Sequence, residues 1–104
     1  MTRTPETTVT EDLLFAIRDE AARGRTNNGP HHSAHEAWAV LHEEMDELWD
    51  EVRKKCPDDE AMVLEALQVA AMALRFIQDI CPEGVTKRIC KQRRATLTVL
   101  PKTR

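Results

Sequence analysis

The sequence predicts an all-α protein, and three observations support that fold class. Glycine is scarce, with 3 residues among 104, and tyrosine is absent. Runs that alternate apolar and polar residues, the pattern of half-buried strands, do not occur. Apolar residues instead recur three and four positions apart, which places them on one face of a helix. We therefore expect a helical bundle with little or no sheet.

The first helix is expected from about Glu11 to Arg23. Thr8 and Glu11 have the spacing of a capping box, in which two side chains satisfy the free amides of a helix start. Glycine commonly follows the last residue of a helix, so we expect Gly24 to end this one. A dense run of turn-forming residues then predicts a loop over 26–30.

The second helix has the clearest start signal, because Ser33 and Glu36 also have capping-box spacing. It is expected to continue to about Lys55, just before the Cys56-Pro57 pair. We interpret both tryptophans of the chain as core residues rather than as platforms for a nucleobase. They belong to an apolar seam at helical spacing, which consists of Trp38, Leu41, Met45, Leu48, Trp49 and Val52.

The third helix is expected from Asp58 or Asp59, either of which can cap it, to about Ile80. A helix that is apolar nearly all round has to be buried, and one short chain cannot easily cover it. We therefore expect a helical bundle completed by oligomerisation, as a homodimer or a homotetramer. The apolar residues of this helix are Met62, Val63, Leu64, Leu67, Val69, Ala70, Ala71, Met72, Ala73, Leu74, Phe76 and Ile77.

The length of 104 residues predicts one domain over residues 1–104. We expect its core at 33–80 and a basic C-terminal segment at 83–104, which forms a short helix followed by an irregular tail over 96–101. A net charge of −3 argues against a nucleic-acid binder, whose surface is strongly basic. No apolar run approaches the ~20 residues of a membrane span, and the N-terminus lacks a signal-peptide core. Three cysteines without a CxxC pair fit a reducing compartment. We therefore expect a cytoplasmic protein that does not bind membranes.

Acidic residues are densest in the second expected helix. At roughly 100° per residue, Glu44, Glu47 and Glu51 lie on one stripe beside the apolar seam. The few polar residues of the third helix also share one stripe, and buried polar groups need partners. The simplest partner is the acidic flank of the second helix, directly or through Mg²⁺ or Mn²⁺, which prefer oxygen ligands. A solvated acidic face is the alternative. The polar stripe consists of Glu65, Gln68, Arg75 and Asp79.

These two segments resemble the MazG-like all-α nucleoside triphosphate pyrophosphohydrolases. Members of that family carry an EExxE motif and, after a spacer, an ExxD motif. This sequence has EEMDE at residues 43–47 and EALQ at residues 65–68, and the resemblance covers residues 33–80. It implies a MazG-like helical bundle in which Glu44, Glu47 and Glu65 bind the metal and carry catalysis. Gln68 stands where the family has aspartate, and an amide oxygen is a weaker ligand that brings no charge.

The resemblance implies hydrolysis of a nucleoside or deoxynucleoside triphosphate to the monophosphate and pyrophosphate. Arg75, His31 and Lys87 are candidates for binding the phosphates, although Arg75 can equally pair with Asp79 one turn on. For His31 and Lys87 the sequence favours the alternative of a solvated surface residue. Gln68 favours a second hypothesis, a nucleotide-binding protein that sequesters or senses its ligand without hydrolysis. A purely structural interaction module is the third.

Overall fold

The structure is a computed structural model that describes residues 5–99, which form four α-helices and no strand. The helices are α1 (Pro5–Asn28), α2 (Ala34–Val52), α3 (Asp59–Ile80) and α4 (Glu83–Val99). The expected all-α class is therefore confirmed for this part of the chain. None of these helices is both long enough and apolar enough to cross a membrane.

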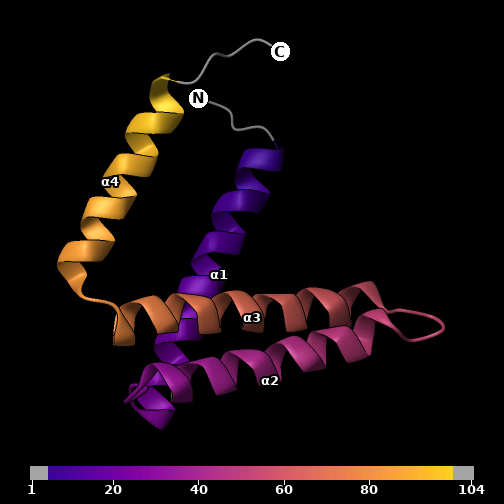
Figure 1. Ribbon diagram of the computed structural model, residues 1–104. Coiled ribbons are helices and arrows are strands. Elements are labelled where there is room, and N and C mark those ends of the chain that lie inside the picture. Colours follow the sequence, from indigo (N-terminus) through magenta and orange to yellow (C-terminus); the bar gives the residue numbers. More distant parts are fainter. Residues whose placement is uncertain (1–4, 100–104) are drawn as a thin grey trace.

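The four helices form an open arrangement rather than a closed bundle (Figure 1). α2 and α3 run antiparallel as a hairpin and make the most extensive packing, and α1 crosses α3. α4 leaves the end of α3 and extends away from the hairpin, without comparable packing against any other described helix. The tertiary packing therefore consists mainly of the contacts of α3 with α2 and with α1.

α1 is longer than its sequence predicts. It begins at Pro5 rather than Glu11, so Thr8 lies inside the helix and does not cap it. The helix also continues through Gly24 to Asn28, and the expectation that Gly24 ends it is wrong. Gly29 takes that role instead, with a φ of 77° and an amide that donates to the Arg25 carbonyl at 2.8 Å. Positive φ is the conformation that glycine adopts without steric cost.

The predicted start of α2 is confirmed at Ser33, whose hydroxyl accepts a 3.1 Å hydrogen bond from the Glu36 amide. The Glu36 carboxylate accepts from the His32 amide at 3.3 Å. α2 ends at Val52 rather than near Lys55.

α3 begins after Asp58, which occupies the cap position without a side-chain cap hydrogen bond. Residues 96–99, expected to be irregular, are helical in α4, whereas Leu100 and Pro101 lie outside the described residues.

The buried core of the single chain is small and consists mostly of short side chains. Ala21 on α1 packs with Ala71 and Met72 on α3, and partly buried neighbours surround this cluster. Trp38 and Trp49 are 52% and 59% exposed, so within one chain they are not the core residues that we expected. Many other large apolar side chains are also exposed, among them Leu14, Phe15, Met45, Val63, Leu64 and Ile77.

Candidate metal centre

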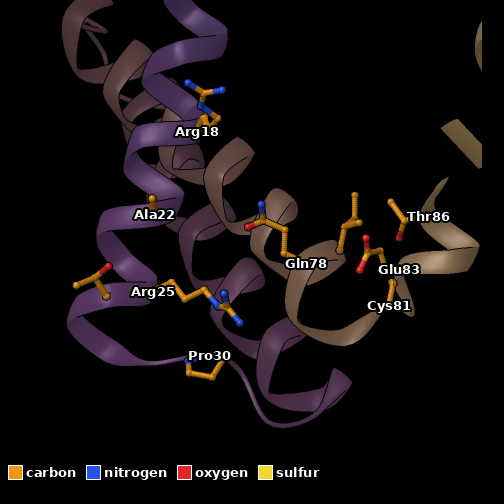
Figure 2. Close-up of a pocket in the computed structure, with 10 residues that line it drawn as sticks. Arg18, Ala22, Arg25, Pro30, Gln78, Cys81, Glu83 and Thr86 are labelled. Carbon is orange, nitrogen blue, oxygen red and sulfur yellow. The ribbon is translucent and has the colours of Figure 1, made fainter.

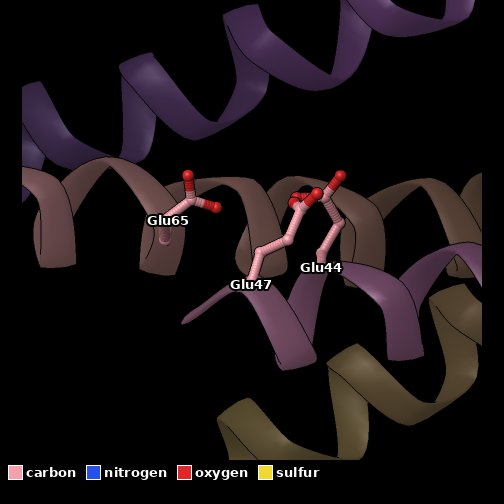
Figure 3. A group of neighbouring side chains, drawn as sticks. All are labelled: Glu44, Glu47 and Glu65. Carbon is pink, nitrogen blue, oxygen red and sulfur yellow. The ribbon is translucent and has the colours of Figure 1, made fainter. Parts of the chain in front are cut away.

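Three glutamates from two helices bring their carboxylates together, as the sequence predicts. Glu44 and Glu47 come from adjacent turns of α2, and Glu65 comes from the facing turn of α3. One carboxylate oxygen of each lies within 4.8 Å of the other two. Figure 3 shows all three side chains on the same side of the hairpin, the side that α1 crosses. We refer to Glu44, Glu47 and Glu65 as the carboxylate cluster.

The electrostatics of this cluster are unfavourable for three free carboxylates. The pKa of Glu44 is raised from its usual value of 4.5 to about 7. Partial burial of the side chain is the largest cause, followed by a hydrogen bond to Glu47 and by repulsion from the neighbouring carboxylates. A substantial fraction of Glu44 is therefore protonated at neutral pH, and a positive charge entering the cluster would favour the deprotonated form.

The environment of Glu65 is also consistent with a bound cation. Its Oε2 atom is buried and has no hydrogen-bond partner. A buried polar atom without a partner costs free energy, and ordered water or an ion commonly supplies the missing contact. A divalent cation with a preference for oxygen ligands fits both this atom and the oxygen-only donor set.

Gln68 lies one helical turn from Glu65 on α3. It is next to Glu20 of α1, a residue that we did not expect near the site. Glu20 of α1 has a lowered pKa because its carboxylate accepts hydrogen bonds from Arg23 and then from Gln68. Its side chain is only 18% exposed. Glu20 therefore adds a carboxylate from α1 next to the turn that contains Gln68. No motif identifies Glu20 in the sequence, because only the crossing of α1 over α3 brings it there.

We expected the whole polar stripe of α3 to face the acidic flank of α2, but only its N-terminal residue Glu65 joins the carboxylates of α2 among the described residues. The C-terminal half of the stripe faces α1 and the loop after it. Arg75, which is 3% exposed, donates from Nη2 to the Gly29 carbonyl at 2.8 Å. Its Nε lies 4.0 Å from Asp79 Oδ2, so the pairing of Arg75 with Asp79 is present. This burial directs the Arg75 guanidinium at protein groups rather than at a ligand beside Glu65.

Asp79 is the centre of this second polar group. Its side chain is fully buried, and its Oδ2 accepts a 2.9 Å hydrogen bond from the His31 amide. Its Oδ1 lies 2.8 Å from Arg25 Nε without hydrogen-bond alignment, so that contact is an ion pair. We call Arg25, His31, Arg75 and Asp79 the Asp79 network. It joins the end of α1, the following loop and α3.

The remaining candidate residues lie apart from the carboxylate cluster. The His31 side chain is 7% exposed, with Nδ1 3.8 Å from Asp79 Oδ2. The Lys87 side chain lies on α4, is 75% exposed and pairs with Glu83 at 2.9 Å. Of the residues predicted to form the site, the structure therefore gathers Glu44, Glu47 and Glu65, with Gln68 one turn away.

The chain was also compared with known proteins. No family model, curated protein or solved structure matches it. The function therefore has to be argued from the chemistry of the carboxylate cluster.

Proposed function

We propose that the protein is a metal-dependent nucleotide pyrophosphohydrolase, which converts a nucleoside or deoxynucleoside triphosphate to the monophosphate and pyrophosphate. The observation that carries this proposal is the convergence of Glu44, Glu47 and Glu65, whose carboxylate oxygens lie within 4.8 Å of one another on two helices. The raised pKa of Glu44 and the buried, unpartnered oxygen of Glu65 support it. Both features are expected of a site whose charge a cation would balance.

Glu44, Glu47 and Glu65 would hold Mg²⁺ or Mn²⁺. A bound divalent cation neutralises a polyphosphate and lowers the pKa of a coordinated water, which is the chemistry that pyrophosphate release needs. The two helices would hold the carboxylates in position around the cation. The charge of the cation would lower the pKa of Glu44 and so keep this carboxylate deprotonated. Gln68 would contribute at most a neutral oxygen.

We also propose that the protein is a homodimer or homotetramer with a MazG-like bundle. The resemblance of residues 33–80 to that family is one support. The other is the exposed apolar surface of the single chain, which includes Trp38, Trp49 and Leu64. Single exposed apolar residues are ordinary, but exposed apolar surface on successive helices indicates a protein contact.

A second candidate function is a protein that binds a nucleotide without hydrolysing it. The observation that favours this alternative is the amide of Gln68, which stands where the resembled family has a carboxylate and which interacts with Glu20. With one negative charge fewer, the site would still attract a cation and a triphosphate, but it would activate water less well.

A nucleotide screen separates these functions. Each common nucleoside and deoxynucleoside triphosphate is incubated with Mg²⁺ or Mn²⁺, and pyrophosphate release is measured beside calorimetric binding of the same nucleotide. Three proteins are compared: wild type, Gln68→Asp and Gln68→Asn. The Asn variant keeps the amide but shortens it, so it controls for the lost contact with Glu20.

Release by wild type, or release that increases in Gln68→Asp but not in Gln68→Asn, supports the enzyme. Tight binding without release by wild type or Gln68→Asp supports the sequestering protein instead. If no nucleotide is bound or cleaved by any of the three proteins, both functions are wrong.

A further inference from the structure

A pocket of about 750 Å³ lies between α1 and the junction of α3 with α4. Figure 2 shows the side chains of Arg25 and Gln78 extending into it from opposite walls. The carboxylate cluster lies in the middle of the α2–α3 hairpin, whereas this pocket lies at the C-terminal end of α3. The residues that line it include Arg18, Ala22, Arg25, Gln78 and Glu83.

The Arg25 side chain is fixed at the wall of this pocket by an ion pair. Its Nε pairs with Oδ1 of the fully buried Asp79 at 2.8 Å, which fixes one edge of the guanidinium. The side chain is nevertheless 52% exposed and lines the pocket, so the rest of the guanidinium is open to a ligand. A planar guanidinium with one edge fixed by a carboxylate can offer its remaining donors to two oxygens of an anion at once.

Other donors lie around the same pocket. Arg18 is two turns before Arg25, so the two residues share a face of α1 about 10 Å apart along the helix axis. The Arg18 guanidinium lies over the Phe15 ring, 5.1 Å from its centroid, and the side chain also lines the pocket. The N-terminal turn of α4 forms the opposite wall, and a helix N-terminus carries a partial positive charge. Gln78 adds an amide.

One acidic group also lines the pocket. The Glu83 carboxylate is paired with Lys87 at 2.9 Å, which offsets its charge. Ala22, Pro30 and Ile77 supply apolar surface beside the cations. The combination of two arginines, a helix N-terminus and an apolar wall suits an anion attached to a less polar group.

We propose that this pocket binds a phosphate-bearing small molecule, with Arg25 and Arg18 as its principal contacts. The spacing of the two arginines suits an extended anion, such as a diphosphate, better than a single phosphate. This site is independent of the carboxylate cluster, so it would bind its ligand without a divalent cation. The two sites are therefore separable by experiment.

The test uses pyrophosphate and inorganic phosphate as probes, titrated into the full chain by calorimetry in the presence of a chelator. Arg18→Gln removes a cation that has no contact with Asp79, so it does not disturb the buried ion pair. Ala22→Glu adds a negative charge at an exposed position of the pocket, and Ala22→Gln adds the same bulk without charge. Arg53→Gln removes an equal charge from the end of α2, where Arg53 pairs with Asp50.

We expect saturable binding of pyrophosphate that is weakened about tenfold or more by Arg18→Gln and by Ala22→Glu, since hydrogen bonds to charged groups are strong. Ala22→Gln should bind more tightly than Ala22→Glu, and Arg53→Gln should match the wild type. Absence of saturable binding in the chelator would overturn the proposal, as would equal weakening by Arg53→Gln. Binding that appears only when Mg²⁺ is present would assign the anion to the carboxylate cluster and would also overturn it.

Discussion

Gly24 lies directly against Arg75, and a Cβ atom at Gly24 would be 3.2 Å from Arg75 Nη1. Arg75 cannot easily yield, because it is buried and its Nη2 is bound to the Gly29 carbonyl. We expect Gly24→Leu to displace Arg75 and to lower the free energy of unfolding by about 1–3 kcal/mol, the usual cost of overpacking. Chemical denaturation measures this change.

Gly84 is the matched control, because a Cβ there would meet nothing within 4 Å. Gly84→Leu should leave the free energy of unfolding unchanged or slightly raised, since leucine favours a helix more than glycine does. If Gly24→Leu is as stable as wild type, the contact of Gly24 with Arg75 does not constrain the crossing of α1 over α3.

Asp79 should be the most sensitive acidic residue for stability. Asp79→Asn keeps the shape of the side chain but leaves Arg75 and Arg25 without their counter-charge. Breaking a buried ion pair by removing one partner costs about 3–5 kcal/mol, and the half-exposed Arg25 places our expectation at the lower end. The same change in the exposed Asp46, which pairs with His42 at 3.7 Å, should alter stability by less than about 1 kcal/mol. Equal effects in thermal unfolding would contradict a structural role for the Asp79 network.

Local sequence signals predicted the parts of this fold that local chemistry determines. The Ser33 cap, the end of α3 near Ile80 and the common face of Glu44 and Glu47 all follow from helical periodicity and capping. Glu65 joined the predicted cluster because the hairpin brings its stripe against that face. Predicting these features requires only the spacing of residues along each helix and the packing of α2 against α3, which follows it in the sequence.

Tertiary packing determined the parts that the sequence did not predict. Glycine at position 24 resembles a helix end, but its lack of a side chain serves the close approach of Arg75 instead. The ion pair of Arg25 with Asp79 and the position of Glu20 beside Gln68 depend on how α1 crosses α3. A crossing geometry has no signature in spacing along one helix, so these contacts could not be predicted from the sequence alone.

The raised pKa of Glu44 has a consequence for stability in the absence of metal. Between pH 4.5, its usual pKa, and about 7, the folded state keeps a proton on Glu44 that the unfolded state releases. Unfolding therefore releases a proton in this range, and stability should fall as the pH rises through it. Glu44→Gln removes this contribution, so its stability relative to wild type should be greater at pH 7.5 than at pH 5.

Denaturation of both proteins at the two pH values, in the presence of a chelator, measures this difference. The comparison cancels contributions from the histidines, which both proteins share. A difference between the two proteins that is the same at pH 5 and pH 7.5 would show that Glu44 titrates normally.

The exposed apolar surface leads to an expectation about assembly. Light scattering at micromolar concentration should give a mass of at least twice the 11.9 kDa of one chain. Trp49→Asp and Leu64→Asp place a charge on side chains that are 59% and 58% exposed in the single chain, so they should disrupt assembly without destroying the helices. Lys54→Asp, on an exposed side chain paired with Glu51, should leave the mass unchanged. A stable wild-type monomer would contradict the proposed oligomer.

Binding of Mn²⁺ to the carboxylate cluster tests the central claim most directly. Calorimetry at pH 8, above the pKa of about 7 of Glu44, avoids competition from its proton. We expect saturable binding by wild type that is weakened about tenfold or more by Glu65→Gln, since even residues that only support metal ligands contribute that much. Asp50→Asn should bind as wild type does, because Asp50 is exposed and paired with Arg53 at 3.0 Å. Wild type without saturable binding, or equal weakening in Glu65→Gln and Asp50→Asn, would contradict a metal site at Glu44, Glu47 and Glu65.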